Sequence, residues 1–291
     1  MTDFLEQVIA ERRADVATAR NAASEEELLS TAKENLFSRS HGGGVSAWPP
    51  PGYDGFTSAL RLRSRGQLAV IAEVKRVSPA QGVLAQDVDA ATLAHTYARA
   101  GATAISVLTE PRHWGGSLDD LAAVRDAVPT LPILCKDVIV DEYQIVQARA
   151  AGADAILLIA EALSDDELRR FIDRANSLGM GVLLEAHEPV AFGRAVATNA
   201  PIVGVNARNL HQPREIDIGR VRQLHTFVRD HQVLVAESGI ATIGDARVLP
   251  ARVGAVLIGS ALMLTDDPEP LIRGIAAMGG GRSVRVVEVQ R

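Results

Sequence analysis

Two opposite charges stand at the end of an apolar run near residue 70. Residues 68–72 form a stretch typical of a buried strand, and Glu73 and Lys75 follow it. Side chains two positions apart on a strand point to the same face, so a carboxylate and an ammonium would project together. Burying both groups costs free energy unless they pair or take part in a reaction. The sequence therefore predicts either an ion pair that fills a sheet or part of a site for acid–base chemistry.

Polar or small residues also end several later apolar runs. A cavity with polar walls needs such groups, and each of them taken alone could equally be structural. They are Lys136 and Asp137, then Glu185, then Asn206 and Arg208, then Glu237, Ser238 and Gly239, and finally Gly259 and Ser260.

The apolar runs alternate with helical segments from residue 68 onward. Nearly continuous apolar strands of this kind predict a parallel sheet, and eight strand–helix units predict closure into an α/β (β/α)8 TIM barrel. A doubly wound open sheet is the alternative, but the chain lacks the Gly-x-Gly-x-x-Gly loop of dinucleotide-binding folds. The predicted strands are residues 69–75, 104–108, 133–136, 155–159, 181–185, 202–205, 233–237 and 255–258, and the helices after them are 90–100, 117–127, 141–151, 164–178, 189–198, 218–229, 242–249 and 268–278.

Barrel enzymes carry their chemistry at the C-terminal ends of the strands. Six of the eight predicted strands end in the polar or small groups above, so we predict one polar cavity at that mouth. Ser238-Gly239 and Gly259-Ser260 follow the last two strands and lead into helices, where exposed backbone N–H groups bind anions. Tight turns that need glycine are the alternative. We predict a phosphate site there, with Lys75 close enough to neutralise its charge.

The first 54 residues are predicted to be a helical extension followed by a linker. Apolar residues at near-helical spacing over 3–20 indicate an amphipathic helix, and Ser24 begins a second helix that reaches about Phe37. Glycine and proline are abundant in 38–54, which indicates a loop.

The barrel domain is predicted over residues 55–278, beginning with a short helix from Phe56 to Leu62. Residues 279–291 are predicted to be a flexible tail, in which 284–289 could add an edge strand.

Composition excludes several classes of protein. The 291 residues are 47% hydrophobic and 23% charged, as in globular proteins, and the net charge of −6 gives no bulk attraction to nucleic acid or to an anionic membrane. Cys135 is the only cysteine, which excludes an intramolecular disulfide and fits a reducing cytosol. The N-terminus lacks the pattern of a secretory signal, and no apolar run approaches the roughly 20 residues that span a bilayer. We expect a cytoplasmic protein.

The order and spacing of many motifs resemble the indole-3-glycerol-phosphate synthase family. The resemblance covers residues 55–278, and the N-terminal helical extension is also similar to that of the family, where it packs near the barrel mouth. The motifs are Glu73-Val-Lys-Arg-Val-Ser-Pro79, Val107-Leu-Thr-Glu110, Lys136-Asp137 with Ile139, Tyr143-Gln-Ile145, Gly152-Ala-Asp-Ala-Ile-Leu-Leu-Ile159, Leu184-Glu185, Gly204-Val-Asn-Ala-Arg-Asn-Leu210, Ala236-Glu-Ser-Gly-Ile240 and Leu257-Ile-Gly-Ser260.

This resemblance implies a carbon–carbon lyase of tryptophan biosynthesis. The family converts 1-(2-carboxyphenylamino)-1-deoxyribulose 5-phosphate to indole-3-glycerol phosphate by ring closure, decarboxylation and dehydration, without a metal or an organic cofactor. The implied partner is this phosphosugar–anthranilate substrate. We expect a monomer, with a homodimer as the alternative.

The resemblance also assigns roles to residues. Lys136 would be the general acid at the ribulose oxygen, and Glu185 the base that takes the ring or amine proton. Lys75 would bind the anthranilate carboxylate or the phosphate and assist proton transfer. Glu73, Asn206 and Glu237 would orient the sugar and the lysines, Ser78, Trp114, Arg208 and Leu210 would line the substrate pocket, and Lys75, Ser238, Gly239, Gly259 and Ser260 would hold the phosphate.

General chemistry agrees with the two main roles. Closure onto a ketone needs an acid at the oxygen, and rearomatisation needs a base. Two clustered lysines disfavour each other's charged form, so we expect the pKa of Lys136 to fall, moderated by Glu73 and Glu237.

The chain departs from the family pattern at several positions. Ala80 and Gln81 replace a usual Ser-Lys, so a loop charge is lost. Cys135 replaces an arginine and, pointing away from the mouth, is predicted to pack in the core. Val138 replaces an aromatic residue, and Trp114, where phenylalanine is common, could restore apolar area.

Other functions remain as alternatives at this stage. A paralogue could act on a substituted anthranilate-derived substrate. A phosphoribosyl-anthranilate isomerase or another phosphosugar barrel is a further option, although that isomerase uses a Cys/Asp pair where this chain has Glu73 and Lys75. A non-enzymatic scaffold predicts loss of Lys136 or Glu185, and both are present. His187 is predicted to begin a helix rather than to support Glu185.

Overall fold

Eight parallel strands close into a barrel in the computed structural model, which describes residues 4–40, 54–64, 66–209, 212 and 214–279. The last strand pairs with the first, aligning Ala72 with Ile258. This confirms the predicted TIM barrel, and each strand lies within two residues of its predicted bounds. The strands are β1 Ala69–Val74, β4 Ala104–Leu108, β5 Ile133–Lys136, β6 Ala155–Ile159, β7 Gly181–Ala186, β8 Ile202–Asn206, β9 Val233–Glu237 and β10 Val253–Ile258.

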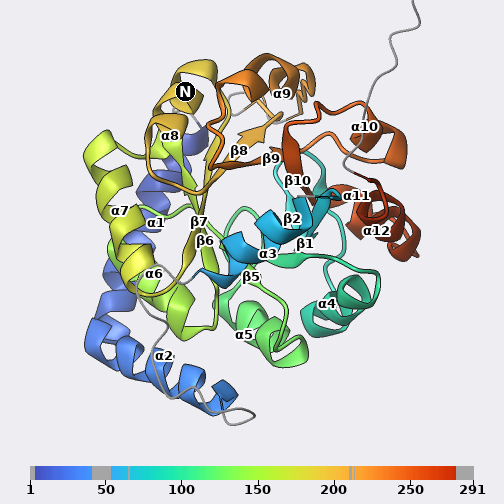
Figure 1. The fold of residues 1–291 in the computed structure, drawn as a ribbon. Coiled ribbons are helices and arrows are strands. Elements are labelled where there is room, and N and C mark those ends of the chain that lie inside the picture. Colours follow the sequence, from blue (N-terminus) through green and yellow to red (C-terminus); the bar gives the residue numbers. More distant parts are fainter. Residues whose placement is uncertain (1–3, 41–53, 65, 210–211, 213, 280–291) are drawn as a thin grey trace, which may run out of the picture.

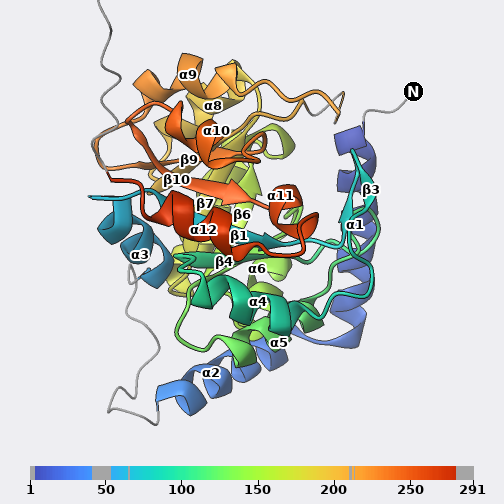
Figure 2. The same ribbon diagram turned by 90° about the vertical axis from the view of Figure 1, so that its right-hand side faces the viewer.

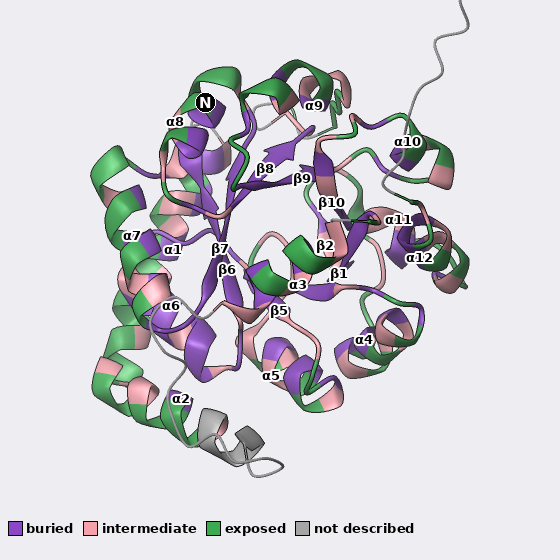
Figure 3. Cartoon of the chain, in the orientation of Figure 1, coloured by how far each residue is buried: buried purple, intermediate pink, exposed green. Residues whose placement is uncertain are grey.

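Helices surround the barrel (Figure 1), and Figure 3 shows their buried faces toward the strands and their exposed faces outward. Short polar side chains begin several of them. Ser164 accepts a hydrogen bond from the Glu167 backbone N–H, and Thr242 does the same for Asp245, which satisfies groups that the helix leaves unpaired. The surrounding helices are α4 Ala90–Arg99, α5 Leu118–Ala127, α6 Glu142–Ala150, α7 Asp165–Ser177, α8 Pro189–Ala197, α9 Gly219–Leu224, α10 Ile243–Arg247 and α12 Glu269–Ala276.

The N-terminal end of the barrel is closed by α3, Gly55–Ser64. Its Phe56 and Leu60 are fully buried and pack with Ile71 and Leu183 in the barrel interior. Figure 2 shows α3 and the first helix at opposite ends of the barrel. An apolar plug at one end leaves the other end for the polar strand termini.

The first helix, α1 Phe4–Ala22, lies across the C-terminal mouth (Figure 2). The buried side chain of Arg12 donates from Nε to Asp137 Oδ1 at 2.9 Å, and the Tyr143 hydroxyl donates to the carbonyl of Ala23 at 2.7 Å. The second helix, α2 Glu25–Ser40, lies against α6. These contacts hold the extension on the barrel, as the resemblance implied.

The structure differs from the prediction in three short segments. The loop after β1 contains a small antiparallel pair, β2 Val77–Ser78 and β3 Gly82–Val83. A four-residue helix, α11 Ser260–Met263, follows β10. The helix predicted over 218–229 ends early, because α9 buries Val221 and Leu224 whereas Phe227, in the 3-10 helix η2 His225–Phe227, is exposed.

Other expectations on the chain's organisation stay predictions. The division into 1–54, 55–278 and 279–291 is one of them. Most of the predicted loop 38–54 and nearly all of the predicted tail lie outside the described residues.

Candidate active site

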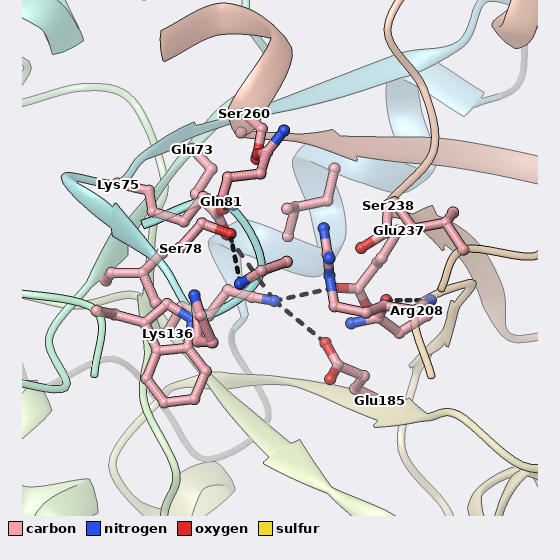
Figure 4. A pocket seen from close by; sticks show the side chains of 18 of the residues that line it. Glu73, Lys75, Ser78, Gln81, Lys136, Glu185, Arg208, Glu237, Ser238 and Ser260 are labelled. Atoms are coloured by element: carbon pink, nitrogen blue, oxygen red, sulfur yellow. Dashed lines mark hydrogen bonds and ion pairs between the residues drawn. The ribbon is translucent and has the colours of Figure 1, made fainter. Parts of the chain in front are cut away.

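A pocket of about 420 Å³ opens at the C-terminal mouth of the barrel, between the strand ends and α1. Phe4, Leu5 and Val8 of α1 form part of its wall. Figure 4 shows charged side chains from different strands pointing toward one another within it. The strand ends that the sequence singled out therefore do converge on one cavity.

Lys136, at the end of β5, lies at the centre of the charged groups (Figure 4). Its Nζ donates to Glu185 Oε2 at 3.1 Å and to Glu237 Oε2 at 3.2 Å, and lies 3.8 Å from Glu73 Oε2. All three carboxylates are buried, on β7, β9 and β1. One ammonium thus joins three strands of the barrel.

The pKa of Lys136 shifts opposite to the sequence-based expectation. Burial disfavours the ammonium, but the charges of Glu185, Glu237 and Glu73 outweigh burial and raise the pKa of Lys136 above its ordinary value. The prediction of a lowered pKa was wrong because it weighed the second lysine above three carboxylates. Lys136 is a protonated donor at neutral pH.

Glu185 and Glu237 both accept hydrogen bonds from Lys136 Nζ, and their pKa values shift in opposite directions. Burial would raise the pKa of Glu185, but Lys136 and His187 outweigh burial and lower it to about 2. Burial and the charge of Glu185 raise the pKa of Glu237 well above its ordinary value. Like charges at this separation cannot both ionise easily, so Glu185 carries the charge and Glu237 tends to hold the proton.

Lys75 and Glu73 project together, as their spacing predicts. Lys75 Nζ lies 3.1 Å from Glu73 Oε1, and both side chains are largely buried. Gly259 makes room for them, because a Cβ on it would collide with Glu73 Oε1 and lie 3.1 Å from Lys75 Nζ. Gly204 makes room for Glu237 in the same way.

The residues predicted to hold a phosphate all line the pocket. Ser238 is the only non-glycine residue with positive φ in the described part of the chain, at 65°, and Gly239 follows at 78°. The Ser260 hydroxyl is buried and bonds to none of the described residues. The positive φ of Ser238 stores strain, because a residue with a side chain rarely adopts it, and it turns the chain sharply at the end of β9.

Three of the four predicted substrate-lining residues also reach the pocket. Ser78, Trp114 and Arg208 line it, whereas Leu210 lies outside the described residues. Trp114 packs at 54° to the ring of Phe4, with 6.0 Å between centroids. Asn206 orients the next loop by accepting the backbone N–H of Arg208 at 3.0 Å.

Sequence reasoning missed two contributors. His187 does not begin α8, whose N-cap is Glu188; its ring is buried and its Nε2 lies 3.3 Å from Glu185 Oε1. The signal was its position two residues after Glu185, because side chains two positions apart on an extended segment point to the same side. Arg12 was the other, and its pairing with Asp137 across 125 positions left no local signal.

Cys135 is buried in the core and does not line the pocket, as predicted. Burial raises the pKa of its thiol to about 12, so it is not a nucleophile at neutral pH. Across the described ranges, no group of three or more His, Cys, Asp or Glu side chains is placed to hold a metal ion. None of the helices in those ranges is both long and apolar enough to cross a membrane.

Comparisons with known proteins agree with this arrangement. The profile of the family "Indole-3-glycerol phosphate synthase" matches residues 5–275. A protein of that name from Nocardioides sp. is 54% identical over 206 residues, covering 70% of this chain and 78% of its own. Another from Kineococcus radiotolerans is 40% identical over 285 residues, covering 97% and 98%.

Among solved structures, a 3-hexulose-6-phosphate synthase superposes with a TM-score of 0.58 at 15% identity, covering 72% of this chain and 99% of its own, which shows the shared fold. The family profile spans the extension and the whole barrel. The chain therefore belongs to the indole-3-glycerol phosphate synthase family.

Proposed function

We propose that the chain closes the indole ring of 1-(2-carboxyphenylamino)-1-deoxyribulose 5-phosphate, with loss of carbon dioxide and water. The observation that carries this proposal is the buried contact between a protonated lysine and an ionised carboxylate in the pocket, Lys136 Nζ to Glu185 Oε2 at 3.1 Å. Ring closure needs a proton donor at the ketone oxygen and an acceptor for the ring proton. Lys136 supplies the first and Glu185 the second.

The remaining side chains act on binding and orientation. Lys75 lies beside Gly259, so its ammonium can neutralise the substrate phosphate or carboxylate while Glu73 holds it in place. Ser238, Gly239 and Ser260 complete the phosphate site. Glu237 and Asn206 orient Lys136 and the sugar, and Ser78 and Arg208 line the substrate pocket, as Leu210 would. These groups hold reactants together before the reaction, where a large part of the rate enhancement arises.

The aromatic part of the substrate would lie against the apolar wall. Phe4 and Trp114 contribute rings there, which compensates for Val138 in place of an aromatic residue. This supports the unsubstituted anthranilate substrate over a substituted one. Initial rates with the parent and a methyl-substituted substrate test the preference.

The decisive test follows indole fluorescence after adding the substrate. The wild type should form indole-3-glycerol phosphate without added metal or cofactor, and Glu185→Gln should lose at least about 10²-fold in kcat because the base is gone. A wild type that forms no indole product refutes the proposed function. We also propose that the enzyme works in the cytoplasm as a monomer. Light scattering of the purified protein tests the monomeric state.

A further inference from the structure

His187 lines the pocket beside Glu185, and its second ring nitrogen faces Glu161, which is not among the lining residues. Its Nε2 lies 3.3 Å from Glu185 Oε1, and its Nδ1 lies 3.5 Å from Glu161 Oε2, on the 3-10 helix η1 Ala160–Ala162 that follows β6. The His187 side chain is 3% exposed, whereas that of Glu161 is 16% exposed. Lys136, Glu185, His187 and Glu161 thus form a continuous line from the reaction centre to a partly exposed carboxylate side chain.

The line is held firmly at its outer end. Glu161 Oε1 accepts the backbone N–H groups of His187 at 2.7 Å and Glu188 at 3.0 Å. Arg220 Nη1 donates to the His187 carbonyl at 2.9 Å and also pairs with Glu188. One Glu161 oxygen is therefore fixed by backbone, and the other faces the imidazole.

The contact between His187 and Glu161 is slightly longer than a hydrogen bond. His187 Nδ1 and Glu161 Oε2 are both buried atoms that bond to none of the described residues, and they face each other. Burial would raise the pKa of Glu161, but its interactions with His187 outweigh burial and lower it, so a carboxylate faces the ring. An imidazole between two carboxylates can take a proton on one nitrogen and release one from the other.

The proposed reaction consumes a proton in each turnover. The substrate carboxylate leaves as neutral carbon dioxide, and its bonding electron pair returns to the ring. The ketone oxygen leaves as water and so gains two protons, while the closing ring releases one. Since Glu185 keeps only the released proton, the site must take up one proton from solvent before it can react again.

We propose that Glu161 and His187 form a proton relay that returns this proton to the Glu185–Lys136 pair. The inference rests on the proposed function, since the balance above is that of indole closure. A substrate filling the pocket separates the pair from solvent on the pocket side, whereas Glu161 faces the other nitrogen of the His187 ring and does not line the pocket. Both side chains act through Glu185: His187 borders the pocket beside it, and Glu161 lies outside the pocket lining.

The test compares His187→Ala, His187→Gln and Glu161→Gln, with His95→Ala on the exposed face of α4 as the control. We expect kcat to fall about 10–100-fold in the three relay variants, with KM within about twofold, since acid–base groups contribute at this scale. His187→Gln keeps a donor beside Glu185 but cannot pass a proton. The solvent isotope effect on kcat should rise in Glu161→Gln, because proton uptake becomes limiting.

Added imidazole should restore much of the rate of His187→Ala and leave His95→Ala unchanged. Two results overturn the relay: full kcat in His187→Gln, which would mean a purely positioning role, or no response of His187→Ala to imidazole. If the wild type forms no indole product, the proposed function fails; if the wild type is active and the relay variants match it, only the relay fails.

Discussion

Two buried charged clusters lie at opposite ends of the barrel and are built differently. Near the N-terminal end, Arg125 of α5 donates to the carbonyls of Gly152, Pro129 and Leu131 and pairs with Asp154, which also accepts the Ile133 N–H. Every guanidinium nitrogen has a partner, most of them backbone. The pairing of the Arg125 guanidinium is complete without any ligand.

The cluster at the C-terminal end is not balanced in this way. Lys136 faces three carboxylates, and Glu73 Oε2 and Glu237 Oε1 accept hydrogen bonds from none of the described residues. A buried polar atom without a hydrogen bond destabilises the fold, so its persistence beside a cavity indicates a group that is reserved for a ligand. Arg125 thus has the complete pairing of a structural charge, whereas two carboxylates around Lys136 keep oxygens without a hydrogen bond from the described residues, beside a pocket.

Lys136→Met should have the largest effect on activity. Removing the acid is expected to lower kcat about 10³-fold, while the circular dichroism spectrum stays that of the wild type. Without the ammonium, the pKa of Glu185 should also rise from its lowered value. Indole fluorescence measures the rate, and an unchanged rate would show that the acid is another group.

Arg125→Met should lower the free energy of unfolding and leave activity unchanged. Breaking a buried pair and leaving three carbonyls without their donor is expected to cost about 3–5 kcal/mol of unfolding free energy. Urea unfolding measures this, and kcat per folded molecule should stay the same. Arg169→Met is the control, because its pair with Asp166 is exposed and should contribute under about 1 kcal/mol. Equal losses in the two variants would contradict the comparison.

Gly259→Ala should lower kcat/KM by about 10–100-fold because it displaces Glu73 and Lys75 without removing either group. The added methyl collides with Glu73 and crowds Lys75, and shifts near 1 Å in catalytic groups have effects of this size. Gly193→Ala on α8 is the control, since its Cβ would meet no atom within 4 Å. Equal activity of both variants would show that Glu73 and Lys75 adjust freely.

Glu237→Gln should have the smallest effect, a gain in stability whose size depends on pH. A carboxyl whose pKa is raised on folding stabilises the protein below its unfolded pKa of about 4.3, and this is lost as pH rises through the folded pKa. The glutamine variant avoids that loss, so its Tm should exceed that of wild type by a few degrees at pH 7–8 and converge with it near pH 4.

Glu185→Gln provides the opposite case. The lowered pKa of Glu185 contributes stability that is present above about pH 4.3 and is lost as pH falls toward 2. This variant should therefore be less stable than wild type at pH 7. Calorimetry across pH separates the two carboxylates, and the same sign in both variants would contradict the assignment of the proton to Glu237.

Much of this arrangement could be predicted from sequence because buried strands appear as short apolar runs. Apolar runs located all eight strands, and the barrel brings their C-terminal ends together, so Lys136, Glu185 and Glu237 could be grouped without coordinates. The sign of the Lys136 pKa shift could not be predicted, because it depends on distances to three carboxylates. His187 was misassigned because a residue just before a helix reads as its start.

The contacts that hold α1 on the barrel determine when the pocket can form during synthesis. The partners of this helix, Asp137 and Tyr143 among them, follow it by more than a hundred positions. This helix therefore cannot dock until the first three barrel strands, β1, β4 and β5, have been made. Until it docks, Phe4 and Val8 cannot complete the wall of the cavity. The pocket can therefore enclose a substrate only after the strands that hold α1 have folded.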